Sequence, residues 1–157
     1  PSPDRPLPAG ARPVLTLRSR VQRVFDLAPG DTVGYGRTFR ADRPLRAALV
    51  PVGYADGYRR QLANRAWMIV GGERAPVLGR VSMDQTVVAV PPGVDVRVGD
   101  EVIVAGGDPA LGAPSMDDLG EMVGTNSYEM LTGIPARVPR HYLRHGQIVE
   151  IAELEAP

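Results

Sequence analysis

Short apolar runs separated by turn residues constrain the fold of this chain more than any other feature of its sequence. The runs at 45–52 and 86–90 are rich in valine, leucine and alanine, and the second is closed by Pro91-Pro92-Gly93. Short runs of this kind, bounded by glycine and proline, are typical of β-strands. Many such strands at regular spacing predict a mainly β fold, either a Greek-key-like closed β-barrel or a half-closed antiparallel one.

Several of these strands can be placed individually. In the first half of the segment 14–27 the sequence alternates, so that one face of this strand is mostly apolar and the other carries arginines; the faces hold Leu15, Leu17, Ser19 and Val21, and opposite them Arg18 and Arg20. The small apolar residues of 45–52 indicate a strand that is buried on both faces. The runs 67–70 and 75–78 flank Gly71-Gly72 and predict a hairpin. Further strands are expected at 86–90, at 98–104 after a turn, and at 138–140 and 148–151.

One or two short helices are expected in the last third of the chain. Ser115 followed by Asp118 forms a capping box, and apolar residues follow it at helical spacing. Asn126 with Glu129 repeats this pattern, which predicts a second helix that ends near Gly133.

Length and composition limit the domain organisation and the partners. We interpret residues 1–12, with their four prolines, as a tail or linker from an upstream domain, and 13–157 as one domain. No stretch of about 18 apolar residues occurs, so no membrane span is expected. The net charge of +0 argues against nucleic acid or a membrane as the main partner. The absence of cysteine and of a secretory signal favours a cytoplasmic location. His141 and His145 have no third metal-type neighbour, so we interpret them as loop residues and expect no metal site.

Three glycine-rich motifs carry the first candidate site residues. They are Gly34-Tyr35-Gly36, the segment 53–58 with Tyr54, and the segment 79–85 with Met83. Glycine lets the backbone turn sharply and lets a ligand come close. A phenol can then serve as an acid or base, and an irregular strand junction leaves N–H groups free for an anion. Taken singly, each motif is also explained by a purely structural role, with Tyr35 as a core or turn residue and Met83 as core filler.

Further candidates follow from their positions. Tyr128 falls in the first turn of the second expected helix, where a phenol can donate to a phosphate, although packing explains it equally well. Arg60, Arg80 and Arg140 carry charges that suit an acidic small molecule, and each is also compatible with a solvated surface position.

Taken together and in this order, the motifs resemble the C-terminal domain of alanine racemase. The resemblance covers about residues 12–150, from Leu15–Val21 through the three glycine motifs to 125–129 and 137–140. It implies a parent of two domains, in which an N-terminal (β/α)8 barrel binds pyridoxal phosphate on a lysine. It further implies a head-to-tail homodimer, in which each site joins the barrel of one subunit to the C-terminal domain of the other. The implied reaction interconverts L- and D-alanine and supplies D-alanine to cell-wall peptidoglycan.

The resemblance also implies roles for individual residues. Tyr35 matches the catalytic tyrosine that serves the substrate face opposite the cofactor lysine. Tyr54 matches a tyrosine at the active-site entrance, and Met83 matches the residue whose backbone N–H meets the substrate carboxylate. Tyr128 matches a tyrosine that contacts the cofactor phosphate. The remaining entrance positions of the family correspond to Arg60, Arg80 and Arg140.

The basic residues of the chain set a limit on this activity. All 18 are arginines, and pyridoxal-phosphate enzymes hold their cofactor through a lysine. We therefore expect this chain to supply half of an active site and to be inactive alone. Asn126-Ser127 departs from the family pattern, in which an apolar residue is common just before the tyrosine.

Two alternatives remain beside the racemase. One is a non-catalytic β-barrel that serves as a binding or interaction module, and the other is the β domain of a related pyridoxal-phosphate decarboxylase. The retention of all four candidate site residues disfavours the first. The sequence context of Tyr35 and of Met83-Asp84-Gln85 disfavours the second.

Overall fold

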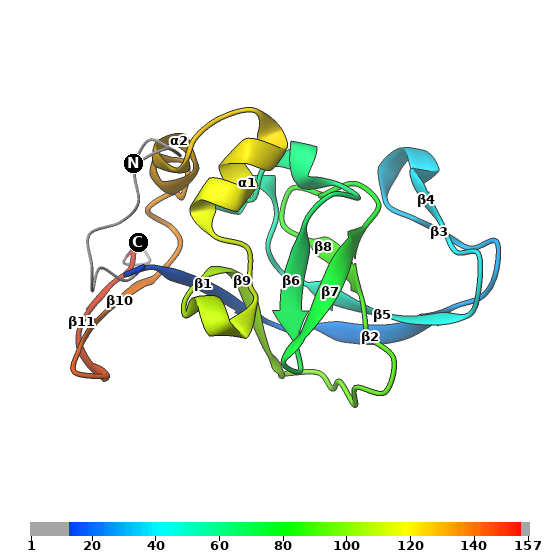
Figure 1. Cartoon of the computed structure of the whole chain (residues 1–157), viewed down its shortest axis with the longest axis horizontal. Helices are drawn as coiled ribbons and strands as arrows, with labels where there is room; N and C mark the ends of the chain where they lie inside the picture. The colour runs from blue at the N-terminus through cyan, green and yellow to red at the C-terminus, as the bar shows by residue number, and fades with distance from the viewer. Residues whose placement is uncertain (1–12, 155–157) are drawn as a thin grey trace.

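A seven-stranded antiparallel sheet forms the body of the molecule and curves into a half-barrel (Figure 1). This computed structural model describes residues 13–154, so the expected tail at 1–12 lies outside the described residues. The strand order in the sheet is β1-β9-β6-β7-β8-β5-β2. The strands are β1 (Thr16–Arg20), β2 (Arg23–Leu27), β5 (Leu45–Val50), β6 (Trp67–Val70), β7 (Glu73–Leu78), β8 (Thr86–Ala89) and β9 (Glu101–Gly106).

The two end strands of the sheet are consecutive in the chain. β1 pairs with β9 and β2 pairs with β5, and only Val21 and Gln22 lie between them. The Val21 N–H donates to Asp100 O at 2.9 Å, and the Gln22 N–H donates to Leu49 O at 2.8 Å. One bent segment therefore joins both ends of the sheet. The mainly β class is confirmed, and the strand expected over 14–27 is divided by this bend.

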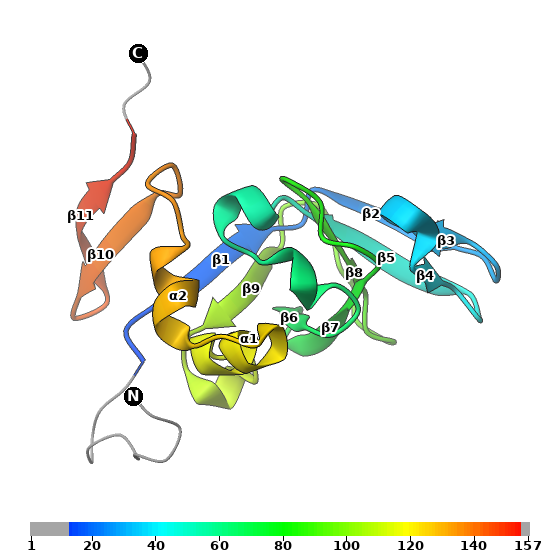
Figure 2. The same cartoon turned by 90° about the horizontal axis from the view of Figure 1, so that it is seen from above.

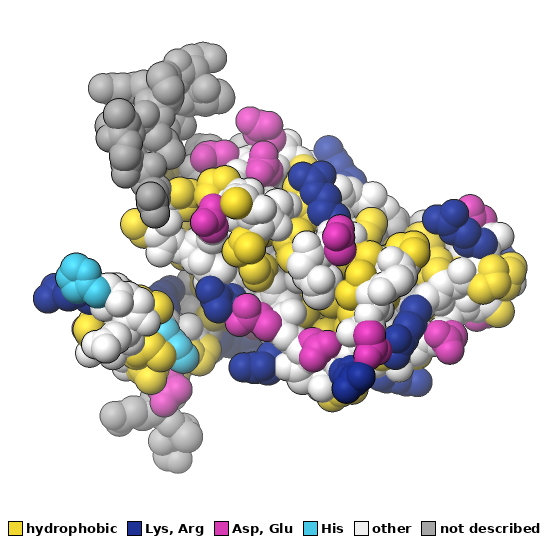
Figure 3. All heavy atoms as spheres, turned by 60° about the horizontal axis from the view of Figure 1, so that its bottom comes forward, with side chains coloured by type: hydrophobic (Ala, Val, Ile, Leu, Met, Phe, Trp, Pro, Cys, Tyr) yellow, Lys and Arg dark blue, Asp and Glu magenta, His cyan; other side chains and the backbone are white. Residues whose placement is uncertain are grey.

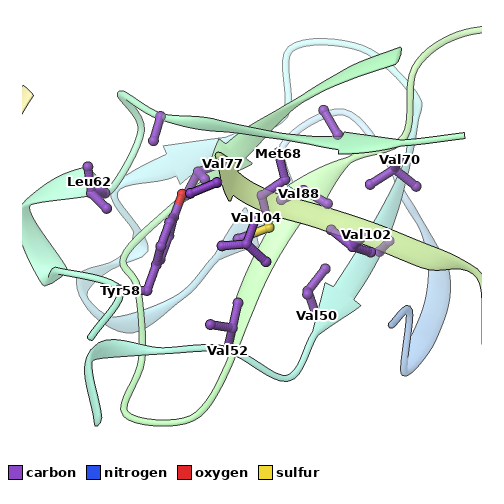
Figure 4. Packing of buried hydrophobic residues seen from close by; sticks show 14 of the residues in the cluster. Val50, Val52, Tyr58, Leu62, Met68, Val70, Val77, Val88, Val102 and Val104 are labelled. Atoms are coloured by element: carbon purple, nitrogen blue, oxygen red, sulfur yellow. The ribbon is translucent and has the colours of Figure 1, made fainter. Parts of the chain in front are cut away.

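The core supports the predicted pattern of burial. The main apolar cluster contains Ala48 and Val50 of β5, whereas Ala47 of the same strand belongs to a second, smaller cluster. The prediction that this strand is buried on both faces is therefore confirmed. Figure 4 shows Tyr58 within the main cluster, beside Leu62 and surrounded by valines.

Two short helices follow the last strand of the sheet, as expected. They are α1 (Met116–Val123) and α2 (Ser127–Thr132). Ser115 forms the predicted capping box with Asp118, and the Asn126 side chain accepts the Glu129 N–H. Each helix also contributes one side chain to the main core, Leu119 from α1 and Met130 from α2.

Short 3-10 helices and two small hairpins complete the chain. The 3-10 helices, which the sequence pattern did not predict, are η1 (Tyr35–Arg37), η2 (Tyr54–Asp56), η3 (Arg60–Leu62) and η4 (Pro109–Leu111). The hairpins pair β3 (Thr32–Val33) with β4 (Phe39–Arg40), and β10 (Arg140–Arg144) with β11 (Gln147–Ala152).

The β10–β11 hairpin projects from the body of the molecule (Figure 2). The strand expected at 138–140 begins only at Arg140, because Pro139 has no N–H to give to a ladder. The interpretation of His141 as a loop residue is wrong, since it lies within β10; His145 lies in the turn.

No helix between residues 13 and 154 is long and apolar enough to cross a membrane.

Candidate functional site

Tyr35 lies on a tight turn that is pressed against Arg80. Gly34 and Gly36 both have a positive φ, 74° and 72°. A Cβ on Gly34 would lie 2.9 Å from Arg80 N, and one on Gly36 would lie 3.2 Å from Arg80 Cζ. Glycine is therefore needed at both positions for two reasons: its backbone adopts a positive φ, and a side chain would collide with Arg80. Tyr35 itself is 71% exposed, so it is a turn residue and does not fill the core.

Tyr35 and Arg80 line one hollow in the surface. The hollow has a volume of about 380 Å³, a size that suits a small ligand. Its apolar lining comes from Leu49 and Val87, which are directly paired across β5 and β8. Gly34, Ser82 and Gln85 complete the lining. A phenol and a guanidinium thus face a shared cavity on the rigid sheet.

The second glycine motif packs along the third. Gly53 is buried and has φ −148°, a conformation open to any residue, yet an added Cβ would overlap Ser82 O and Met83 O. The Tyr54 N–H donates to Ser82 O at 3.0 Å, and the Ala55 N–H donates to Met83 O at 2.9 Å. These bonds place Tyr54 and Met83 next to each other.

Met83 is available to a ligand. Its side chain is 55% exposed, so the explanation of Met83 as core filler is wrong. Within the part of the chain that the structure describes, the Met83 N–H donates no hydrogen bond, while the neighbouring Ser82 N–H donates to Gln85 O at 2.9 Å. An N–H on such an exposed residue, with no acceptor among the described residues, can receive an anion.

Asp56 fixes the turn that carries Tyr54. One carboxylate oxygen accepts the Gly53 N–H at 2.9 Å, and the other accepts from Arg137 at 2.7 Å. Gly57, with φ 92°, closes the turn against the Gly133 carbonyl at the end of α2. No local sequence pattern marks Arg137 for this role, because its partner lies 81 positions away.

Asn64 is a second residue whose role no sequence pattern indicates. Its side-chain oxygen accepts the Gly79 N–H at 2.6 Å, and its amide nitrogen lies 3.3 Å from Thr38 Oγ1. It joins the segment after Tyr35 to the start of the third motif. Its φ of 56° suits asparagine, but nothing in the sequence distinguishes it from a surface turn residue.

Tyr128 lies in the first turn of α2, as expected, and is exposed. α2 is tied to the residue that follows the second motif by an ion pair between Arg59 and Glu129 at 2.8 Å. Arg60 and Arg80 line a second hollow of about 510 Å³. Arg140 lies at the start of β10 and donates to Ile134 O at 3.1 Å, outside both hollows.

The side chains present suit an anion better than a metal. Among residues 13–154, no three histidine or carboxylate side chains are grouped closely enough to hold a metal ion. Arginines and exposed phenols suit carboxylate or phosphate groups. With no lysine in the chain, a cofactor aldehyde has no ε-amino group here with which to form an imine.

Comparison with known proteins gives one consistent result. A family model described as "Alanine racemase, C-terminal domain" matches residues 14–142. Alanine racemase 1 of Clostridium acetobutylicum is 42% identical over 142 residues, covering 89% of this chain and 36% of that protein. The alanine racemase of Sorangium cellulosum is 42% identical over 144 residues, covering 90% of this chain and 38% of that protein.

Solved structures agree. The alanine racemase of Bacillus anthracis, crystallised with bound L-Ala-P, has a TM-score of 0.79 and 34% identity over 88% of this chain and 35% of its own. The enzyme from a D-cycloserine-producing Streptomyces lavendulae has a TM-score of 0.80 and 37% identity over 86% of this chain and 35% of its own. The chain thus spans little more than a third of the proteins that it matches.

Proposed function

Because the chain belongs to the alanine racemase C-terminal domain family, we propose that it is the part of a pyridoxal-phosphate-dependent alanine racemase that supplies one of two catalytic acid–base groups. In this proposal the segment that the relatives have in addition is a (β/α)8 barrel, which carries the cofactor on a lysine. The parent is a cytoplasmic enzyme that supplies D-alanine to peptidoglycan. Residues 13–157 form its C-terminal domain.

Tyr35 is the acid–base group. Racemisation removes a proton from one face of the substrate Cα and returns a proton to the other face, so two groups on opposite sides suffice. Pyridoxal phosphate, when bound, delocalises the electron pair left at Cα. The phenol oxygen of Tyr35 accepts or donates the proton on one face. The observation that carries this role is an exposed phenol on a glycine-flanked turn, in a hollow that it shares with Arg80.

Neighbouring groups bind and orient the substrate. The unbonded N–H of Met83 receives the carboxylate of alanine, and the exposed phenol of Tyr54 beside it forms part of the entrance. The charges of Arg60 and Arg80, which share a hollow, attract an anionic substrate toward this entrance. Arg140 is assigned an entrance position by the family resemblance only.

Tyr128 is the residue of this chain that would contact the cofactor. Its hydroxyl, on an exposed side chain, can donate to a phosphate oxygen, and α2 is held against the second motif where Gly57 meets Gly133. This fit is limited to the phosphate, since the chain has no lysine. The barrel of a second subunit covers this surface in a head-to-tail homodimer.

The alternatives are less well supported. A non-catalytic module has no need for an exposed tyrosine that lines a hollow together with an arginine, as Tyr35 does with Arg80. The relatives cited above are named alanine racemases, and none of these is a decarboxylase.

A reconstitution experiment tests the proposal. This chain is mixed with the barrel domain of its parent and pyridoxal phosphate, and alanine racemisation is measured. We expect neither half to be active alone and the mixture to turn over, while a Tyr35→Phe chain restores little. If the cofactor-loaded barrel forms a complex with this chain but shows no turnover, the proposed function is wrong.

Borohydride reduction tests whether the cofactor is bound covalently by the barrel and not by this chain. After incubation of this chain alone with pyridoxal phosphate, mass spectrometry should show no adduct on any side chain, because no lysine is present. A stable side-chain adduct would contradict the assignment of the cofactor to the barrel; labelling of the α-amino terminus would not.

A further inference from the structure

The β10–β11 hairpin has one apolar face that the described residues leave open. Residues paired across a hairpin share a face, and successive residues alternate between faces except at a register shift, which here leaves Val149 unpaired between Ile148 and Glu150. His141 pairs with Ile151 and Leu143 pairs with Ile148, so these four residues form one face. The opposite face carries the pairs Arg144–Gln147, Tyr142–Glu150 and Arg140–Ala152.

The apolar face is large relative to the hairpin. Leu143, Ile148 and Ile151 are each more than half exposed. Figure 3 shows apolar side chains at the surface beside the two histidines, which both belong to this hairpin. The hairpin shares no strand pairing with the seven-stranded sheet. An isolated two-stranded hairpin is at best marginally stable in water, so a second surface is needed to cover it.

The position of the hairpin favours an occupant from the same polypeptide. β1 begins on the side of the molecule that carries the hairpin, in both views of the chain (Figures 1 and 2). The matched relatives are almost three times as long as the matched segment, so most of each relative lies outside this domain. A domain that precedes β1 would enter next to the open face.

We infer that the face formed by His141, Leu143, Ile148 and Ile151 is the docking surface for the barrel domain of the same chain. This inference rests on the proposed function, which supplies the barrel. It gives the domain two separate contacts. The hairpin holds the barrel of its own subunit, and the surface around Tyr35 meets the barrel of the other subunit.

Thiol labelling tests this inference, because the chain contains no cysteine. Ile148→Cys places a reporter on the apolar face, and Glu150→Cys places a matched control on the opposite face of the same strand. Both variants are made in this chain and in the full-length parent, and Leu143→Cys is a second reporter in case Ile148→Cys disturbs the fold. Circular dichroism checks folding, and mass spectrometry reads labelling of the hairpin peptide.

We expect the reporter to react on the order of tenfold more slowly, or slower still, in the parent than in this chain, because burial makes labelling depend on local opening. The Glu150→Cys control should react equally in both, and the protection should persist when the dimer is diluted to monomers. Equal reporter rates in both proteins would overturn the inference. So would protection that appears only in the dimer, because that would place the other subunit on this face. Concentration-dependent protection in this chain alone would also overturn it, because that would place a second copy of the chain there.

Racemase activity and cofactor absorbance of the parent are measured separately, so failure of the proposed function is distinguishable from failure of the docking surface.

Discussion

Exposure distinguishes the candidate site residues from the structural ones at the scale of single side chains. The four site residues Tyr35, Tyr54, Met83 and Tyr128 all expose their side chains, whereas Tyr58, within the same glycine motif as Tyr54, is almost completely buried. Tyrosine therefore has two uses in one short segment. Tyr54 is exposed at the surface, while Tyr58 anchors the turn in the core (Figure 4).

Replacement of Tyr35 by phenylalanine in the parent enzyme should impair proton transfer on one face of the substrate only. The variant removes only the phenol oxygen from an exposed side chain, so packing and cofactor content should be unchanged. Loss of one positioned acid–base group lowers the rate by about 10²–10⁴-fold. Deuterium incorporation at Cα, measured from each alanine enantiomer, should become strongly asymmetric. Parental exchange from both enantiomers would mean that Tyr35 has no catalytic role.

Replacement of Tyr58 by phenylalanine should stabilise the domain. The Tyr58 hydroxyl is buried and has no hydrogen-bond partner among the described residues. A buried, unsatisfied polar group costs about 1–3 kcal/mol, and phenylalanine keeps the ring and its packing. Urea unfolding should show a higher free energy of unfolding for Tyr58→Phe. A lower value would indicate a partner for the hydroxyl, such as a buried water.

The same hydroxyl should make stability depend on alkaline pH. Burial raises the pKa of Tyr58 above its ordinary value of about 10. Above that pH the unfolded chain releases the proton while the folded chain retains it, so the unfolded state binds fewer protons and the free energy of unfolding falls as the pH rises. Denaturation curves between pH 8 and about 11 should show this decline, and Tyr58→Phe should reduce it. An identical decline in both proteins would assign it to other groups.

Close backbone contacts organise the site at the scale of elements. Glycines on one motif make room for the carbonyl groups of another, so the turn with Tyr54 lies directly on the segment with Met83. The 3-10 helix at Tyr54 is short, and Asp56 and Arg137 tie it to the segment before β10. The site is therefore assembled from turns that are held against a rigid sheet.

Substitution of Gly53 by alanine should separate these turns. The φ of Gly53 suits alanine, so the cost arises from overlap of the new methyl group with two carbonyl oxygens, and overpacking of this kind costs about 1–3 kcal/mol. In the parent enzyme kcat/KM should also fall, because Tyr54 and Met83 move apart. Gly72→Ala is the control for destabilisation away from the site, since its φ of 83° also strains alanine but it has open space around it and lies in the β6–β7 turn. An effect on kcat/KM no larger than that of Gly72→Ala would contradict this account.

Local rules explain which elements were predictable. The hairpin at Gly71-Gly72 and the caps at Ser115 and Asn126 were predicted correctly, since each depends on residues a few positions apart. The bend at Val21-Gln22 could not be predicted, because it arises from two strands that are distant in sequence and bond to opposite sides of one segment. The contacts of Asn64 are also long-range, so the pattern around it carried no information about them.

The candidate site was predicted from the family resemblance and not from local sequence patterns. The resemblance to the racemase family predicted that the three glycine motifs form one site. The local pattern of each motif was also compatible with a purely structural role. The structure brings these motifs into contact and exposes Tyr35, Tyr54 and Met83. The catalytic and binding roles of these residues remain predictions.

At the scale of the whole molecule, the domain combines a buried core with exposed surfaces. It has its own apolar core, yet it exposes both the surface with the candidate site residues and the apolar face of the β10–β11 hairpin. It also spans little more than a third of the relatives that it matches. The central claim at this scale is that Tyr35 acts in a site completed by the barrel of another subunit.

Co-expression of two inactive variants of the full-length parent tests this claim most directly. One subunit carries Tyr35→Phe, and the other carries alanine in place of the cofactor lysine of the barrel. In a head-to-tail homodimer, a mixed dimer has one site with both defects and one intact site, so random pairing restores about a quarter of the original sites. We predict racemase activity near that level in the mixture, with mixed dimers verified by native mass spectrometry. Verified mixed dimers with no more activity than the separate variants would place Tyr35 and the lysine in the same subunit's site, or show that Tyr35 is not catalytic, and would contradict the account.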